Sequence, residues 1–252
     1  MIALITGATS GIGEATTLQF AKNGYDVIIT GRRKERLDKL ETKLKQNGTK
    51  VLSLYFDIRN YEEVKTAISS IPYDWKAINV LVNNAGLASG LGTLENGLLD
   101  DWEKMIDTNL KGLLYTTKEV IPLLKTAGQA QIINIGSIAG KEVYANGNVY
   151  CSTKHAVDAL NKAMRIELLP YGIKVTAIHP GMVETEFSIV RFHGDEERAK
   201  KVYEGLTPLY AEDIAETIYW VASRPDHVNI NELTIMPKAQ ANSTTAIRNS
   251  KC

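Results

Sequence analysis

Short apolar runs alternate with longer amphipathic stretches along the chain, and this alternation constrains the fold more than any other feature. The runs are mostly continuous, as in strands buried on both faces of a parallel sheet. Strands are predicted at residues 3–6, 27–30, 51–56, 79–82, 131–135, 175–178 and 233–236. Helical crossovers are predicted at residues 13–23, 34–47, 61–70, 99–125, 149–170 and 211–223. This order predicts an α/β fold with a doubly wound parallel sheet of about seven strands.

Two regions interrupt the alternation without marking a second domain. Residues 185–208 form a long insertion, and such insertions in compact enzymes are often active-site lids. Residues 238–252 form a polar tail after the last predicted strand, and tails of this kind are more often frayed than functional. No linker or repeat separates the rest, so we expect one domain over residues 1–252.

Charge and hydropathy exclude several classes of protein. The 252 residues carry 29 Lys and Arg against 29 Asp and Glu, without the basic surplus of a nucleic-acid binder. No apolar run approaches the ~20 residues of a membrane-spanning helix, and the first residues lack a signal-peptide pattern. Two cysteines, Cys151 and Cys252, are too few for a disulfide framework. We therefore expect a cytoplasmic protein with neither nucleic-acid nor membrane partners.

A glycine-rich turn joins the first predicted strand to the first predicted helix. Its spacing is G-x-x-x-G-x-G, which differs from the G-x-G-x-x-G fingerprint, and ordinary tight turns also use glycine. At a strand–helix junction, however, glycines let a pyrophosphate approach the free N–H groups of the helix. The turn therefore predicts a Rossmann-type dinucleotide site. The expected contacts are Gly7, Thr9, Ser10, Gly11, Ile12 and Gly13.

Basic residues end the second strand, where an acidic residue would suit the free ribose of NAD. The chain instead reads Arg32-Arg33-Lys34. Arginine grips phosphate bidentately, as the 2′-phosphate of NADP requires. A solvated charge cluster is the alternative, but positive charge at a helix N-terminus is unfavourable. The pattern therefore favours NADP as the cofactor.

Three residues could carry ketone–alcohol chemistry. Tyr150 and Lys154 are spaced i, i+4 on one helix face, and Ser137 ends the fifth strand. A phenol can exchange a proton with a carbonyl oxygen if a nearby ammonium lowers its pKa. A serine hydroxyl can hold that oxygen. Each residue alone has an ordinary structural explanation, but the three together with a cofactor-binding turn indicate a catalytic site.

Together these motifs resemble the short-chain dehydrogenase/reductase family over residues 2 to about 236. The shared features are the glycine-rich turn, Asn83-Asn84-Ala85-Gly86, Asn109, Ser137, the Y-x-x-x-K of Tyr150 and Lys154, and Pro180-Gly181. The resemblance implies that Tyr150 is the general acid/base, that Lys154 lowers its pKa and holds the nicotinamide ribose, and that Ser137 orients the substrate carbonyl. Asn109 would anchor a water that relays protons to Lys154. Further cofactor contacts implied are Arg32, Arg33, Asp57, Ile58, Asn84, Ala85, Gly86, Pro180, Gly181, Val183 and Thr185.

The segments 83–90, 180–192 and 228–231 are similar to those of NADP-dependent 3-hydroxy acid dehydrogenases, a group that includes serine and allo-threonine dehydrogenases. A small acid substrate needs a cation near the nicotinamide. Arg191 lies in the predicted lid, and we hypothesise that it contacts the substrate carboxylate. The alternative is a surface arginine paired with Glu186 or Asp195.

The resulting prediction is an NADP-dependent oxidoreductase that acts on small 3-hydroxy acids. One alternative is a reductase of other carbonyls, such as 3-oxoacyl thioesters or dicarbonyls. Another is a non-catalytic module that senses NADPH. The four histidines show no metal-ligand spacing with cysteine, so no metal is expected. Helices apolar on several sides, as at Trp102, Met105, Leu110, Leu113 and Leu114, together with the resemblance predict a homotetramer.

Overall fold

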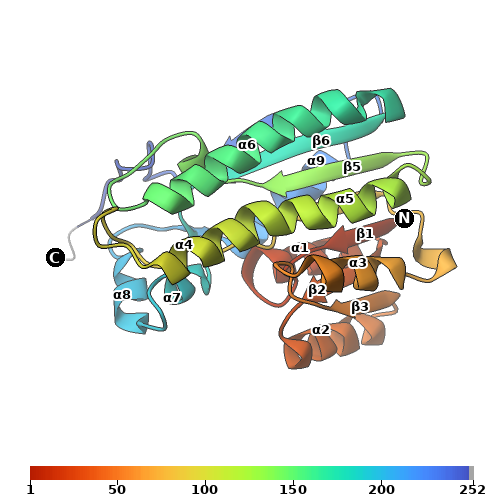
Figure 1. The fold of residues 1–252 in the computed structure, drawn as a ribbon, viewed down its shortest axis with the longest axis horizontal. Helices are drawn as coiled ribbons and strands as arrows, with labels where there is room; N and C mark the ends of the chain where they lie inside the picture. The colour runs from red at the N-terminus through yellow and green to blue at the C-terminus, as the bar shows by residue number, and fades with distance from the viewer. Residues whose placement is uncertain (250–252) are drawn as a thin grey trace.

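A parallel sheet forms the centre of the protein, for which a computed structural model describes residues 1–249 (Figure 1). Within this range its strand order is β3-β2-β1-β4-β5-β6-β9. These strands are β1 (Ile2–Ile5), β2 (Asp26–Gly31), β3 (Val51–Tyr55), β4 (Val80–Asn83), β5 (Ala130–Ile135), β6 (Ile173–Pro180) and β9 (Glu232–Ile235). The order reverses between β1 and β4, which is where a doubly wound sheet binds its ligand. Cys252 and the last residues of the predicted tail, 250–252, lie outside the described residues.

Helices cover both faces of the sheet (Figure 1). They are α1 (Gly11–Lys22), α2 (Lys34–Gln46), α3 (Tyr61–Ser69), α4 (Leu99–Ile106), α5 (Leu113–Leu124), α6 (Asn148–Leu168), α7 (Phe187–Arg191), α8 (Glu196–Lys201) and α9 (Ala211–Ala222). Helices α3, α5 and α6 share one apolar core, and α1, α2 and α9 share the other. The sheet has a core on each face because successive side chains of a strand point to opposite faces. In β1, Ile2 and Leu4 face the first core, whereas Ala3 and Ile5 face the second. The predicted doubly wound α/β fold is confirmed.

Two local features differ from the sequence prediction. The helix expected at residues 99–125 is divided, because a π-helical turn at Asp107–Gly112 separates α4 from α5. A small parallel pair also brackets the predicted lid, with β7 (Val183–Glu184) joined to β8 (Leu209–Tyr210). Strands this short form only through their tertiary pairing, so the sequence carries little signal for them.

The described part of the polar tail packs against its own subunit. The side-chain Oε1 of Gln240 accepts a hydrogen bond of 2.8 Å from the backbone N–H of Met182. The backbone N–H of Asn249 donates to the Gly205 carbonyl, also at 2.8 Å. These bonds hold the tail beside the segment predicted as a lid. Among residues 1–249, no helix has both the length and the apolarity to cross a membrane.

Candidate active site

The carboxyl ends of the parallel strands meet at one edge of the sheet, and a cavity of about 340 Å³ lies there. It brings together residues that the sequence assigned to the cofactor and to catalysis. Those that line it are Gly7, Thr9, Ser10, Gly11, Ile12, Arg32, Arg33, Asp57, Ile58, Asn84, Ala85, Gly86, Ser137, Tyr150, Lys154, Pro180, Gly181, Val183 and Thr185. Three other predicted residues, Gly13, Asn109 and Arg191, are placed elsewhere and are described below.

The glycine-rich turn has the shape of a phosphate cradle. Gly7 has a φ of 67°, in the left-handed region that favours glycine. The side chain of Ser10 does not cap α1, so the first N–H groups of this helix remain available to an anion. Gly13 packs directly against the turn, because a Cβ there would lie 2.2 Å from the Gly7 carbonyl oxygen. Gly13 therefore has a packing role in the turn, and its contact with the cofactor stays a prediction.

Arg33 reaches across the cavity edge to the glycine-rich turn. Its Nη2 donates to Oγ1 of Thr9 at 2.8 Å and to Oγ of Ser10 at 2.7 Å. Two hydroxyls and a guanidinium at a helix N-terminus form a donor set that suits a phosphate group. The residues present therefore fit NADP at the position that the sequence indicated.

Arg32 lies beside the carboxylate expected to contact the adenine ring. Its Nη1 is 3.3 Å from Oδ2 of Asp57, and Arg59 also donates to Asp57, with Nη2 at 2.6 Å from Oδ2. Burial alone would raise the pKa of Asp57, but hydrogen bonds from Arg59 and the charge of Arg32 hold this pKa at about 2. Asp57 is therefore an ionised acceptor at the cavity wall.

The catalytic candidates meet at the inner end of the cavity. Ser137 follows β5, and Tyr150 and Lys154 lie in the first two turns of α6, both of them buried. The ammonium of Lys154 donates to the Ile135 carbonyl oxygen at 2.8 Å. Burial lowers the pKa of Lys154 to about 8. The expected grouping of serine, tyrosine and lysine on one cavity is therefore present.

The acidity of Tyr150 differs from the expectation. Burial and the neighbouring Tyr144 raise the pKa of the Tyr150 phenol, whereas the charge of Arg191 and the hydroxyl of Ser137 lower it. Burial outweighs the other effects, and Lys154 directs its ammonium to a backbone carbonyl. The effect of Lys154 on this pKa therefore stays a prediction for the cofactor-bound protein. In the structure described, the cation that lowers the pKa of the phenol is Arg191.

Asn109 lies in the π-helical turn and is fully buried. Its Oδ1 accepts from the Leu87 N–H, and its Nδ2 donates to the Leu87 carbonyl, each at 2.8 Å. A Cβ placed on Gly86 would lie 3.2 Å from Oδ1 of Asn109 and 3.5 Å from Nζ of Lys154. Asn109 and Lys154 therefore approach Gly86 from the same side, although Asn109 itself does not line the cavity.

Arg191 lines a second, smaller cavity of about 200 Å³, which shares Tyr150 with the first. Its guanidinium carbon lies 5.0 Å from the Tyr150 ring centroid, and its Nη2 donates to the Tyr144 hydroxyl at 2.7 Å. Within residues 1–249 its buried Nε has no hydrogen-bond partner. The expected alternative, pairing with Glu186 or Asp195, is wrong. Glu186 instead pairs with Arg33 and Arg36, and Asp195 caps α8 by accepting from the Arg198 N–H.

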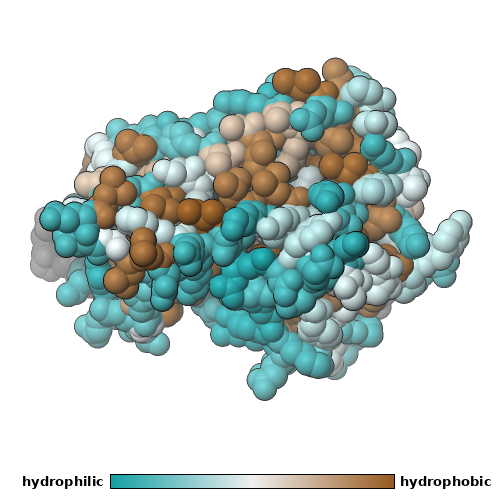
Figure 2. Space-filling model, in the orientation of Figure 1, coloured by the Kyte–Doolittle hydropathy of each residue, from teal (hydrophilic) through white to brown (hydrophobic). Residues whose placement is uncertain are grey.

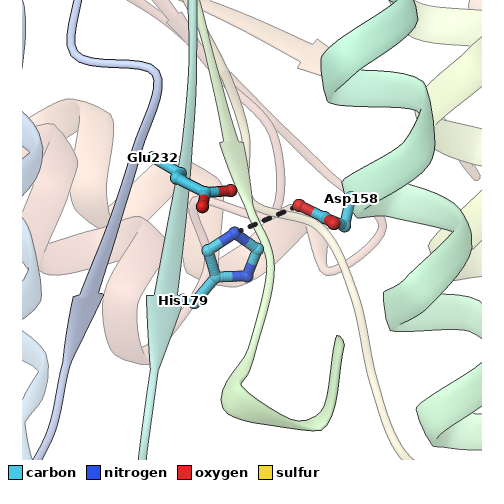
Figure 3. Close-up of side chains that lie close together, drawn as sticks. All are labelled: Asp158, His179 and Glu232. Carbon is cyan, nitrogen blue, oxygen red and sulfur yellow. Dashed lines mark ion pairs between the residues drawn. The ribbon is translucent and has the colours of Figure 1, made fainter. Parts of the chain in front are cut away.

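A group that the sequence did not connect consists of Asp158, His179 and Glu232 (Figure 3). His179, at the end of β6, points toward Asp158 of α6, with Nε2 3.5 Å from Oδ1, while Glu232 of β9 faces them. These are ligand types that metals use. However, the ammonium of Lys141 already lies 2.8 Å from Asp158 and 2.6 Å from Glu232. An entering ion would have to displace this lysine, so we assign the group to anchoring the chain that follows Ser137.

His179 also contacts the backbone of a catalytic candidate. Its Nδ1 lies 3.3 Å from the Ser137 carbonyl oxygen. Burial, and next the charge of Lys141, lower the pKa of His179, so the ring is neutral at neutral pH. A neutral ring with its proton on Nδ1 can donate to that carbonyl. The partners of His179 come from distant segments, so no local sequence pattern indicated these contacts.

Known proteins resemble this chain over nearly its whole length. A family model described as short chain dehydrogenase matches residues 1–195. "NADP-dependent 3-hydroxy acid dehydrogenase YdfG" of Salmonella typhi is 47% identical over 251 residues, which cover 99% of this chain and 100% of the relative. "Serine 3-dehydrogenase" of Rhizobium radiobacter is 44% identical over 238 residues, 94% of each chain. The solved structure "The Closed form of serine dehydrogenase complexed with NADP+" has a TM-score of 0.93 and 43% identity, covering 99% of this chain and 100% of its own.

Proposed function

Because the chain belongs to the short chain dehydrogenase family, we propose that it transfers a hydride between NADP and a small 3-hydroxy acid. The observation that carries this proposal is the position of Tyr150. Tyr150 lines both the cavity that holds Arg32 and Arg33, which we assign to the cofactor phosphate, and the smaller cavity that holds Arg191. A residue at this boundary can exchange a proton with a substrate held beside a nicotinamide.

NADP, when bound, would supply or accept the hydride. In the direction of reduction, the phenol of Tyr150 donates its proton to the substrate oxygen, and in oxidation the phenolate takes it back. Ser137 orients that oxygen by hydrogen bonding. Lys154 holds the nicotinamide ribose, and Asn109 anchors a water that connects Lys154 with solvent. The support for this water is that Oδ1 of Asn109 and Nζ of Lys154 both lie close to the position that a Cβ of Gly86 would take.

Arg191 is the residue that we assign to the substrate carboxylate. Its guanidinium faces the Tyr150 ring and keeps donor capacity, because one buried nitrogen has no partner in residues 1–249. The small volume of the second cavity, about 200 Å³, lies below the ~300–1,000 Å³ common for drug-sized ligands. These features favour a small acid over a 3-oxoacyl thioester. They also favour catalysis over cofactor sensing, which needs no second cavity.

A substrate panel tests the proposal directly. We expect reduction of NADP⁺, followed at 340 nm, with L-serine, D-serine, L-allo-threonine, 3-hydroxypropionate or 3-hydroxyisobutyrate, and little with NAD⁺. A neutral secondary alcohol is the control for the carboxylate. Activity on the neutral alcohol alone would contradict the acid substrate, and equal rates with NAD⁺ would contradict the assignment of Arg32 and Arg33. No turnover with intact NADPH binding would favour the sensing module.

We also propose that the protein assembles as a homotetramer. Figure 2 shows hydrophobic residues gathered over α4, α5 and α6, on one face of the molecule. The exposed apolar side chains in these helices, or directly next to them in the chain, include Leu98, Leu99, Ile106, Leu114, Ile166 and Leu169. Such a surface commonly marks an interface, and a second copy of the same helices would cover it symmetrically. Among the residues used for the sequence prediction, Met105 and Leu113 are instead buried within the chain.

Light scattering at micromolar concentration is expected to give about four times the chain mass of 27.8 kDa. Replacing Leu99 and Leu169 with glutamate should lower this mass, because it places charge in the proposed contact. Glutamate at exposed Tyr73, which lies outside these helices, is the control. A monomeric mass for the unaltered protein would refute the assembly.

A reducing, cytoplasmic setting belongs to the same proposal. Its support is Cys151, which is a buried free thiol on α6. Free thiols of this kind are the rule where glutathione and thioredoxin keep cysteines reduced.

A further inference from the structure

A carboxylate faces the cavity beside the arginines that we assign to the cofactor phosphate. Glu186 lies directly before α7, and its Oε2 is 3.0 Å from Nη1 of Arg33. Burial alone would raise the pKa of Glu186, but hydrogen bonds from Arg36 and Arg33 hold this pKa below its usual range. The group is therefore ionised at neutral pH. A negative charge thus lies where a phosphate dianion is expected.

Arg36 is the principal partner of this carboxylate. Both oxygens of Glu186 lie 2.8 Å from Nη1 of Arg36. Arg33, in contrast, gives Glu186 one longer contact and directs its Nε and Nη2 to hydroxyls of the glycine-rich turn. The two arginines thus have different principal partners. Arg36 holds the carboxylate, and Arg33 remains directed at the phosphate cradle.

The charge of Glu186, and its neutralisation by Arg36, can affect which cofactor binds. A carboxylate near the adenine ribose accepts a hydrogen bond from the 2′-hydroxyl of NAD, and it repels the 2′-phosphate of NADP. Glu186 could act in this way if it were unpaired. We propose that Arg36 is a specificity-determining residue for NADP, because it neutralises Glu186 beside the phosphate site. This inference rests on the proposed function.

The ion pair between Glu186 and Arg36 also has a structural effect. Glu186 is the residue before α7, and α7 ends at Arg191, which we assign to the substrate. Arg36 lies in the first turn of α2, which directly follows Arg33 of the cavity wall. Their ion pair therefore ties the substrate-binding segment to the phosphate site. Removing the Glu186 carboxylate would break this ion pair, but it would also remove the negative charge that repels the 2′-phosphate of NADP.

A double-mutant cycle in the full-length protein tests the proposal through cofactor binding. Arg36→Gln should weaken NADPH binding by about threefold to tenfold, as expected for a partly exposed charge pair, and leave NADH binding unchanged or tighter. Glu186→Gln in the Arg36→Gln background should restore the NADPH dissociation constant to within about twofold of the original. Calorimetry with adenosine 2′,5′-bisphosphate and with 5′-AMP would isolate the effect on the phosphate.

Lys34→Gln is the matched control, because Lys34 opens the same helix but pairs with Asp38 and does not contact Glu186. Thermal unfolding should confirm that every variant is folded. Equal loss in Lys34→Gln, no loss in Arg36→Gln, or a loss that Glu186→Gln does not relieve would each overturn the role of Arg36. If the unaltered protein binds NADH as tightly as NADPH, the proposed function itself fails. The two failures are thereby distinguished.

Discussion

Replacing Tyr150 with phenylalanine is expected to lower kcat by about a thousandfold while leaving the dissociation constant of NADPH within about twofold. The change removes only the hydroxyl that exchanges the proton. The ring remains, so its edge contact with Phe187, at a centroid distance of 5.6 Å, and its contact with Arg191 can persist. Steady-state rates in both directions and fluorescence titration with NADPH measure the two quantities separately.

Cys151→Ala provides the control for this prediction. Cys151 is buried next to Tyr150 in the chain, and a covalent mechanism through its thiol would be an alternative to proton transfer by the phenol. We expect this variant to keep its kcat within about threefold, because the thiol has no step in the proposed reaction. If Tyr150→Phe retains a tenth of the activity, or if Cys151→Ala loses as much as Tyr150→Phe, the assigned acid/base is incorrect.

The parts of the site that could be predicted follow strand ends and helix spacing. Gly7 comes directly after the first apolar run, and Ser137 comes soon after the fifth. Because parallel strands end at one edge, their sequence positions alone bring these residues together. The i, i+4 spacing of Tyr150 and Lys154 likewise fixes a common helix face. Local patterns therefore sufficed for the cavity and its principal groups.

Contacts between distant segments carry no such pattern. Glu186 and Arg36 are 150 positions apart, and Arg191 and Tyr144 are 47 positions apart. Arg36 follows Arg33 by one helical turn, so its place near the phosphate site could have been inferred, but its partner could not. The acidity of Tyr150 was missed for a related reason. It depends on how deeply the phenol is buried and on where Lys154 directs its ammonium, and packing decides both.

Replacing Arg191 with methionine is expected to raise KM for the hydroxy acid by about a hundredfold, which corresponds to the ~2–5 kcal/mol cost of removing one partner from a buried charge pair. Methionine keeps much of the apolar length of the side chain and removes the guanidinium. The effect on kcat should be smaller, since Tyr150, Ser137 and Lys154 remain. The reverse reaction with the corresponding oxo acid should show the same change in KM. The KM of Arg191→Lys should lie between those of the unaltered protein and Arg191→Met, because a lysine keeps the charge but loses the planar donor set.

Arg198→Met supplies a matched control, since Arg198 lines the same small cavity but stacks on Phe192, with its guanidinium carbon 4.3 Å from that ring centroid. A neutral secondary alcohol separates loss of carboxylate binding from a change in the acidity of Tyr150, to which Arg191 also contributes. If Arg191 binds the carboxylate, KM for the acid rises far more than KM for the alcohol. An equal loss for both substrates would make Arg191 a residue that tunes the phenol. An unchanged KM for the acid, or a larger rise in Arg198→Met, would refute the assignment of Arg191 to the carboxylate.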